Sequence, residues 1–245
     1  MRKKIKLGLA LFISILGIYG LLYEDNAQQI SISNPIVVET EENTREDTKI
    51  LMDNVPEYSG AAYVTLNGNV PEFAEEEITN VAYIKLSELD KLSRCGTAIA
   101  CLGPETITNK ERGSIGHIKP SGWHTVKYPG IISDLYLYNR CHLLMYKASG
   151  ILDDERNLIT GTRYLNVEGM LPFETSLVDY IEESGNHVMY RVTPIFKENN
   201  LVASGVKMEA LSVEDNGQGL SFNVYCYNVQ PGISIDYSNG ESKEE

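Results

Sequence analysis

A group of polar side chains between residues 139 and 174 contains the residue types that chemistry on a phosphate ester requires. They follow one another in the order Arg140, His142, Asn157, Arg163, Asn166 and Glu174. A histidine can accept a proton from water, amide and carboxylate oxygens can ligate a hard metal ion, and arginines bind phosphate through paired hydrogen bonds. This set therefore indicates metal-assisted chemistry at a phosphate.

A strand is predicted directly before the first of these residues. The run ISDLYLY at 132–138 is β-like, and it ends where Asn139, Arg140 and His142 begin. The strand is therefore expected to present the arginine and the histidine at its end.

A helix is predicted at 171–184, LPFETSLVDYIEES, and it would carry Glu174 near its start. Its predicted core-facing residues are Leu171, Leu177, Tyr180 and Ile181. Pro172 is tolerated only in the first turn of a helix, and Gly185 supplies a stop signal. Asn166 is expected on this helix or in the turn just before it.

The remaining pattern predicts strands. The run AAYVTL ends at Asn67 and Gly68, which form a strong turn signal. Three later runs alternate with a period of two and read as an antiparallel meander: 187–196, 201–213 and 220–229. Strands on both sides of one helix make this an α+β domain with an antiparallel sheet.

Four segments are expected along the chain. Residues 1–23 begin with MRKKIK and continue with 17 uncharged, largely apolar residues, which indicates a signal anchor or a cleaved signal peptide and places the rest outside the cytoplasm. Residues 24–55 are polar and acidic and are expected to be a flexible spacer. A single catalytic domain is predicted at 56–238, followed by a polar tail at 239–245.

Charge is distributed unevenly along the chain. The formal net charge is −13, yet the stretch 109–163 contains eight basic and five acidic residues, a local net charge of +3. The charge therefore excludes a protein that binds nucleic acid through a generally basic surface, but it allows one basic site of the size of a phosphate.

Four cysteines do not make a disulfide scaffold in a chain of this length. Cys95 and Cys101 lie six residues apart and could either close a small loop or remain free, and Cys141 and Cys226 stand in different contexts. No CxxC or HExxH pattern occurs, so a structural zinc site is not expected.

The chemical group resembles the DNA/RNA non-specific endonuclease family. The segment NRCH at 139–142 is similar to the family's DRGH, the block 157–166 contains its NL…T…N residues, and a glutamate follows eight residues later. Two further segments, GHIKPSGWH at 116–124 and FNVYCYNVQPGISIDYSNGE at 222–241, look like the secreted DNA-entry branch. The resemblance covers about 60–240 and implies a ββα-metal finger.

The resemblance also implies a role for each matching residue. His142 would be the general base and Asn166 the protein ligand of a single Mg²⁺, for which Mn²⁺ could substitute. Glu174 would hold the water shell of the metal, Asn157 would orient neighbouring groups, and Arg140 would bind a flanking phosphate. Arg163, Lys119 and Lys127 are further candidate phosphate contacts.

Some of these residues have structural alternatives. The two asparagines could be turn or cap residues, and Glu174 could simply favour a helix N-terminus. Trp123 could be a core residue or a base-stacking one. Asn139 replaces the family's usual Asp, Cys141 its usual Gly, and Gly161 stands where many relatives have Gln.

The resemblance implies an exported, metal-dependent endonuclease that cuts DNA and RNA with little sequence preference and needs no nucleotide cofactor. Its N-terminal segment would contact the membrane, and the protein would act extracellularly, either anchored or secreted. Two alternatives belong to other classes of protein function. One is an exported nucleic-acid-binding module with a decayed active site. The other is a surface interaction domain, which only the net negative charge of the chain favours.

Overall fold

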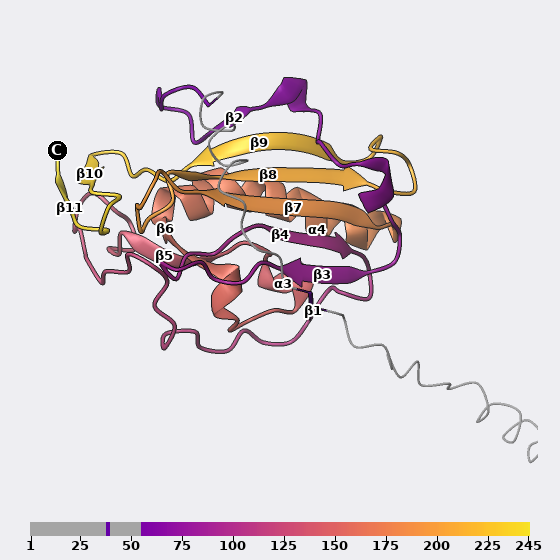
Figure 1. Ribbon diagram of the computed structural model, residues 1–245, viewed down its shortest axis with the longest axis horizontal. Helices are drawn as coiled ribbons and strands as arrows, with labels where there is room; N and C mark the ends of the chain where they lie inside the picture. Colours follow the sequence, from indigo (N-terminus) through magenta and orange to yellow (C-terminus); the bar gives the residue numbers. More distant parts are fainter. Residues whose placement is uncertain (1–37, 40–54) are drawn as a thin grey trace, which may run out of the picture. The chain divides into compact units, whose positions relative to one another are not determined.

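The computed structural model describes residues 38–39 and 55–245. Its main sheet has seven strands in the order β1-β3-β4-β7-β8-β9-β2, and only the β1–β3 pair is parallel among the described strands. The bounds are β1 Val38–Glu39, β2 Tyr63–Thr65, β3 Tyr83–Leu86, β4 Ala98–Leu102, β7 Val188–Ile195, β8 Gly205–Ser212 and β9 Ser221–Tyr227. Figure 1 shows helix α4, Leu171–Ser184, behind the central strands β7 and β8. The α+β prediction with an antiparallel sheet is confirmed.

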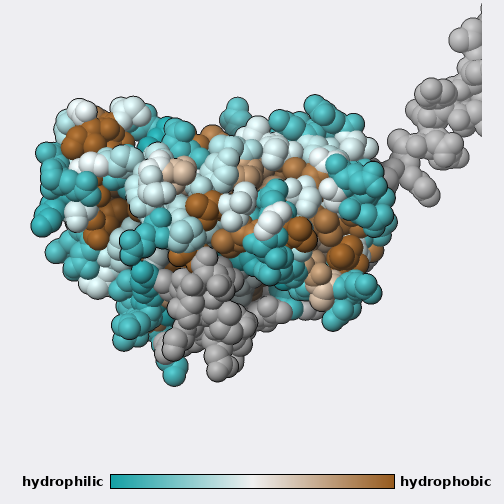
Figure 2. Space-filling model, turned by 90° about the horizontal axis from the view of Figure 1, so that it is seen from above, coloured by the Kyte–Doolittle hydropathy of each residue, from teal (hydrophilic) through white to brown (hydrophobic). Residues whose placement is uncertain are grey.

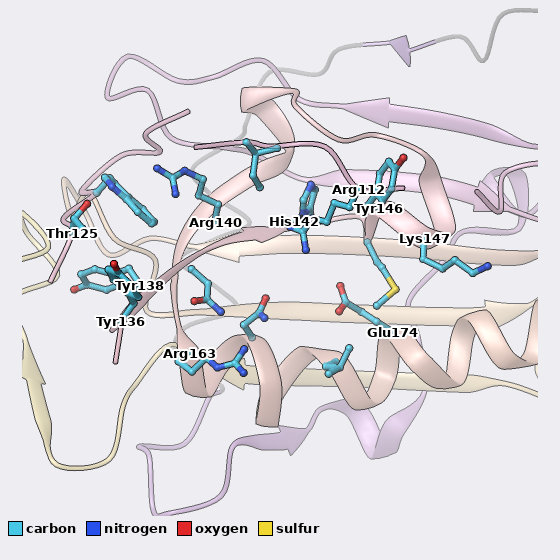
Figure 3. Close-up of a pocket in the computed structure, with 16 residues that line it drawn as sticks. Arg112, Thr125, Tyr136, Tyr138, Arg140, His142, Tyr146, Lys147, Arg163 and Glu174 are labelled. Atoms are coloured by element: carbon cyan, nitrogen blue, oxygen red, sulfur yellow. Dashed lines mark hydrogen bonds between the residues drawn. The ribbon is translucent and has the colours of Figure 1, made fainter. Parts of the chain in front are cut away.

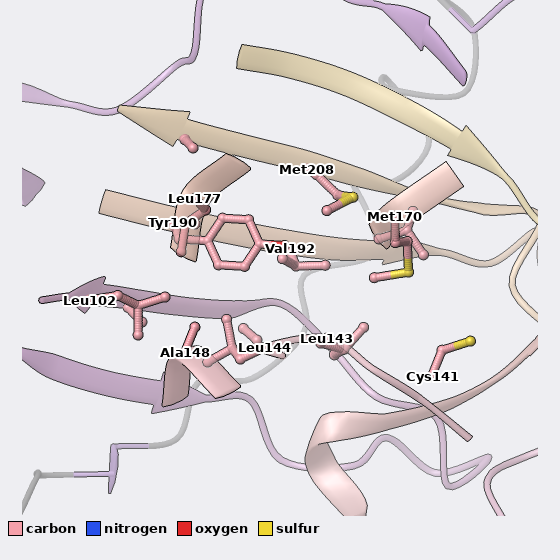
Figure 4. Packing of buried hydrophobic residues seen from close by; sticks show 14 of the residues in the cluster. Leu102, Cys141, Leu143, Leu144, Ala148, Met170, Leu177, Tyr190, Val192 and Met208 are labelled. Atoms are coloured by element: carbon pink, nitrogen blue, oxygen red, sulfur yellow. The ribbon is translucent and has the colours of Figure 1, made fainter. Parts of the chain in front are cut away.

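The predicted meander is confirmed as β7, β8 and β9, which pair in sequence order. Alternation along β7 separates two layers, because successive side chains of a strand point to opposite faces. Tyr190 and Val192 belong to the large core beneath α4, whereas Met189 packs in a second cluster on the other face. Figure 4 shows Tyr190, Val192 and Met208 facing Leu177 within the large core.

Helix α4 has the predicted bounds, and Leu177 and Ile181 are buried as expected. Pro172 stands in its first turn, and Gly185 ends it with φ +72°. The prediction for Leu171 is wrong, because this side chain is 38% exposed and does not face the core. A wide π-helical turn, Leu165–Met170, runs directly into α4, and Leu171 is the first residue after it.

Two strands outside the main sheet carry the histidine motif. β5, Tyr138–His142, pairs with the antiparallel β6, Leu158–Thr162, so that His142 lies opposite Leu158. The predicted bounds 132–138 are wrong, because the motif itself forms the strand, but His142 lies at the end of a strand as predicted. The preceding residues form a turn in which Leu135 adopts φ +70° and its carbonyl accepts a hydrogen bond from the Tyr128 amide.

Shorter elements complete the described chain. They are helix α3 Tyr146–Ser149, the 3₁₀ turns Asn67–Asn69, Glu75–Glu77 and Glu155–Asn157, and the antiparallel pair β10 Ile233–Ile235 with β11 Ser242–Glu244. Strand β1 lies within the predicted spacer, and β11 lies within the predicted polar tail. On the face seen in Figure 2, apolar residues form separate patches among hydrophilic ones.

The predicted signal segment at 1–23 lies outside the described residues. Within 38–39 and 55–245, no helix is long and apolar enough to cross a membrane.

All four cysteines are free thiols, so the possible Cys95–Cys101 bridge does not form. The Cys95 thiol lies in the large core and donates to the Leu158 carbonyl at 3.1 Å. The Cys101 thiol belongs to the cluster on the other face of the sheet and donates to the Thr79 carbonyl at 3.0 Å. The two sulfurs therefore belong to different layers of the domain.

Candidate functional site

A cavity of about 650 Å³ lies between β5, the start of α4 and the segment that precedes β5. It is lined by Arg112, Ile115, Trp123, Thr125, Tyr136, Tyr138, Asn139, Arg140, His142, Met145, Tyr146, Lys147, Arg163, Asn166, Leu171 and Glu174. Five of the eight residues expected at the site are in this list: Arg140, His142, Arg163, Asn166 and Glu174. Asn157, Lys119 and Lys127 do not line the cavity.

The geometry of His142 fixes which of its nitrogens can accept a proton. Its Nε2 lies 2.9 Å from the carbonyl oxygen of Leu152, which can only accept, so Nε2 carries the hydrogen. The lone pair of the neutral ring is then on Nδ1, which lies 3.4 Å from Nη2 of Arg112. Burial lowers the pKa of His142, and Arg112 lowers it further, against the effect of the Leu152 hydrogen bond. With Nε2 protonated, Nδ1 is the ring nitrogen that can accept a proton once the 3.4 Å hydrogen bond from Arg112 is released, so the neutral imidazole can serve as a general base.

Glu174 is a buried carboxylate in the same cavity, and it is 7% exposed. Burial raises its pKa to about 8, although the nearby Arg112 acts in the opposite direction. No hydrogen bond or ion pair within the described residues reaches its carboxylate. Figure 3 shows it extending from α4 towards the space below His142. A buried carboxylate without a partner favours a cation beside it, because a positive charge would offset the desolvation of the ionised form.

Asn166 supplies a second oxygen donor. It lies in the π-helical turn just before α4, as predicted, and it lines the cavity together with Glu174. No group of three or more His, Cys, Asp or Glu side chains in the described part of the chain could hold a metal ion. One amide and one carboxylate suit a hard ion such as Mg²⁺, which keeps most of its water and also takes phosphate oxygens.

Arg140 holds a neighbouring segment in place. Its Nε donates to the Ile118 carbonyl at 2.5 Å, and its Nη2 donates to the Gly116 carbonyl at 2.9 Å. The guanidinium lies 4.0 Å from the centre of the Trp123 ring. Trp123 itself packs against the small core of Tyr128 and Leu137. Arg140 therefore holds residues 116–123 beside the cavity. Its guanidinium also covers one face of the Trp123 ring.

Two other arginines face the cavity. Arg163, expected as a phosphate contact, pairs with Asp134 at 2.5 Å. Arg112 was not selected by sequence reasoning, yet it is the cation that lies next to both His142 and Glu174. Its only sequence signal was its membership of the basic stretch 109–163.

Asn157 is fully buried and holds the backbone that follows His142. Its Oδ1 accepts from the Leu144 amide at 2.9 Å, and its Nδ2 donates to the Leu144 carbonyl at 3.0 Å. It therefore contacts the backbone two residues beyond His142 and does not reach the cavity.

Replacement of Asn157 by Ala should destabilise the fold, because the Leu144 amide would be buried without a partner and its carbonyl would keep only the long 3.4 Å contact from the Ser149 hydroxyl. We expect the free energy of unfolding to fall by about 2 to 4 kcal/mol, as measured by urea denaturation. The exposed Asn199→Ala variant is the control and should change it by about 0.5 kcal/mol or less. A loss for Asn157→Ala that matched the control would contradict this role.

The two candidate lysines and the remaining histidines do not line the cavity. Lys119 is exposed, and the Lys127 ammonium lies 4.7 Å from the centre of the Tyr136 ring. His124 Nε2 lies 3.0 Å from the Asn239 carbonyl, and His117 is exposed. His187 is held between Glu105 and Glu214, outside the cavity.

Comparison with known proteins places this arrangement in a family. The model of the family described as DNA/RNA non-specific endonuclease matches residues 75–214, which include all eight candidate site residues. NucA from Streptococcus agalactiae with a magnesium ion bound is 24% identical, with a TM-score of 0.69 over 83% of this chain and 97% of that one. The Sda1 nuclease with a bound zinc ion is 22% identical, with a TM-score of 0.65 over 75% and 96%.

A structure titled extracellular endonuclease is 21% identical, with a TM-score of 0.53 over 77% of this chain and all of that one. These structures share the α+β fold with the antiparallel sheet. Because the family model covers more than half of the sequence, this chain belongs to the DNA/RNA non-specific endonuclease family.

Proposed function

We propose that the protein is a metal-dependent endonuclease that hydrolyses phosphodiester bonds of DNA and RNA. The observation that carries the proposal is the common cavity of His142, Asn166 and Glu174, in which the Leu152 carbonyl leaves the lone pair of His142 on Nδ1. A base, two oxygen donors and cationic side chains form the set that hydrolysis of a phosphodiester requires.

Each residue has a role that follows from its position. Nδ1 of His142 takes a proton from the attacking water, while the Leu152 carbonyl keeps the ring in the tautomer that allows it. Asn166 would ligate Mg²⁺, or Mn²⁺ in its place, and Glu174 would hold the water shell of the ion. When bound, the ion stabilises negative charge on the phosphate and on the leaving oxygen. Arg112 and Arg163 bind the phosphate, and Arg140 positions the segment next to it.

The candidate groups favour little sequence preference. Arginine, asparagine and bound metal address phosphate oxygens, which are the same at every nucleotide. The local charge of +3 in 109–163 also attracts a polyanion to this part of an otherwise acidic protein. The substrate class is therefore nucleic acid in general.

We further propose that the protein acts outside the cytoplasm. Support comes from the basic and apolar N-terminal segment, either retained as an anchor or cleaved, and from the similar structure titled extracellular endonuclease.

Incubation of the purified protein with supercoiled plasmid and with RNA tests the proposal. We expect both to be degraded in millimolar Mg²⁺ and protected by an excess of EDTA, with activity restored on adding Mg²⁺. Binding of DNA without any cleavage would instead favour the alternative, a nucleic-acid-binding module with a decayed site. Equal cleavage with and without EDTA would contradict the metal dependence.

A further inference from the structure

One end of the cavity is aromatic and has no assigned role in the hydrolysis. Thr125, Tyr136 and Tyr138 line this end, and Figure 3 shows them grouped away from His142, with Lys147 towards the opposite end. Tyr138 is buried, and its hydroxyl donates to the Gly240 carbonyl. Tyr136 is 42% exposed, so its side chain reaches both the cavity and the solvent.

The backbone holds Tyr136 firmly despite this exposure. Residues 127 and 136 form an antiparallel bridge, and amide-to-carbonyl hydrogen bonds flank it, from Tyr128 to Leu135 and from Leu137 to Val126. Arg163 pairs with Asp134 in the same turn. Because the backbone is already held, only the two side-chain torsions of Tyr136 remain to be ordered when a flat ligand stacks on its ring.

Charge distinguishes this end from the opposite one. The Lys127 ammonium lies over one face of the Tyr136 ring, 4.7 Å from its centre, so a base would stack on the opposite face. No carboxylate lies within 4.0 Å of this ammonium among the described residues. Lys147, at the opposite end, is neutralised by Glu182 at 2.9 Å and also donates to Asn109. The Tyr136 end therefore offers an aromatic ring next to an uncompensated cation, a combination that suits a nucleobase with its phosphate.

The length of β5 sets the distance between the general base and the aromatic end of the cavity, where Figure 3 shows Tyr138 next to Tyr136. Tyr138 and His142 are four residues apart on one strand, which corresponds to about 13 Å at 3.3 Å per residue. Stacked nucleotides rise about 3.4 Å each along one strand. A base at Tyr136 is therefore about two to four nucleotides away from the phosphate at His142, the smaller number applying to an extended strand.

We infer that Tyr136, with Lys127 beside it, is a stacking site for an unpaired base of the substrate strand, about two to four nucleotides from the cleaved bond. This inference rests on the proposed endonuclease function and assigns a substrate class to it. Only single-stranded or locally unpaired nucleic acid presents the face of a base, so the site favours single strands over duplexes.

The test compares Tyr136→Ala, Tyr136→Phe and Tyr136→Trp with the parent protein on three substrates. These are a single-stranded DNA 12-mer, the same sequence as a duplex, and bis(p-nitrophenyl) phosphate, a diester that has no base. For Tyr136→Ala we expect a KM for the single strand that is higher by about 5- to 100-fold, the range for loss of one stacked base. The duplex and the small diester should change less than about twofold, and Phe and Trp should retain the parent KM.

The length of the substrate provides a second measurement, because a dinucleotide is too short to reach from His142 to Tyr136. The difference between parent and Tyr136→Ala should be absent on a dinucleotide and should appear between about three and six nucleotides. Dissociation constants measured with Ca²⁺ in place of Mg²⁺ should show the same pattern without cleavage.

Other outcomes separate the two proposals. An equal loss of activity of Tyr136→Ala on all three substrates would mean that Tyr136 maintains the shape of the catalytic site. An unchanged KM for the 12-mer would exclude stacking. Either result would overturn the inference and leave the endonuclease function in place. If the parent cleaved none of the substrates, the endonuclease proposal would fail. The dissociation constants would then decide on stacking independently.

Discussion

His142→Ala should lower cleavage of plasmid by at least about 100-fold, the lower end of the effect of removing a general base. DNA binding should persist, because Arg112, Arg163 and the oxygen donors Asn166 and Glu174 are unchanged. The measurements are initial rates of plasmid cleavage and dissociation constants in Ca²⁺. His187→Ala is the matched control, because His187 is ion-paired outside the cavity, and it should retain the parent rate.

Two further measurements would identify the lost group as a base. Imidazole added to His142→Gly should restore part of the rate. In the parent protein, burial and Arg112 lower the pKa of His142. Because the base must be neutral, the acid limb of the pH profile of kcat/KM should have its midpoint below about 6.5, the ordinary value for histidine. An alanine variant as fast as the parent would show that another group is the base.

Asn166→Ala should have a comparably large effect, through the metal. We expect the rate at limiting Mg²⁺ to fall by at least about 100-fold, because loss of even an indirect partner of a metal costs about 10- to 100-fold in affinity or activity. The Mg²⁺ concentration for half-maximal activity should rise, and high Mg²⁺ should restore part of the rate. Asn166→Asp, which keeps an oxygen donor, should bind the ion at least as tightly as the parent.

Calorimetric titration with Mn²⁺ would measure the same loss without any reaction. Asn199→Ala, at an exposed asparagine that does not line the cavity, is the control and should bind Mn²⁺ like the parent. If Asn166→Ala lost activity but kept the parent affinity for Mn²⁺ and the parent Mg²⁺ dependence, Asn166 would not be the ligand. Its contribution would then lie in contacts with the substrate.

Local patterns along the chain were sufficient for much of the fold. The meander β7–β9 was predicted because alternation of apolar residues reports directly on a strand with two different faces. Helix α4 was predicted with its bounds, because Pro172 and Gly185 mark the two ends through their own backbone preferences. Leu171 contradicted the pattern because, at about 100° per residue, it lies roughly 80° to 120° around the helix from the buried Ile181 and Leu177, which puts it at the edge of the buried face.

The candidate site was predictable only in part. The sequence order of His142, Asn166 and Glu174 was enough to group them, and the structure brings all three to one cavity. Asn157 was grouped with them by the same reasoning, but its side-chain amide forms hydrogen bonds with the backbone of Leu144 and does not line the cavity. Sequence order places residues on neighbouring elements and does not say which way each side chain points.

The sequence by itself determined the family, the α+β class, the main elements and the order of the chemical groups, because these depend on residue types and spacings within short stretches. Only the tertiary structure decided that Arg112 lies beside His142, 30 residues later, and that Arg140 is bound to carbonyls 22 and 24 residues before it. It also separated Cys95 from Cys101 in two layers. The physical reason is that contacts between distant residues are set by how the preceding segment packs against β5, and no local pattern in either segment encodes that packing.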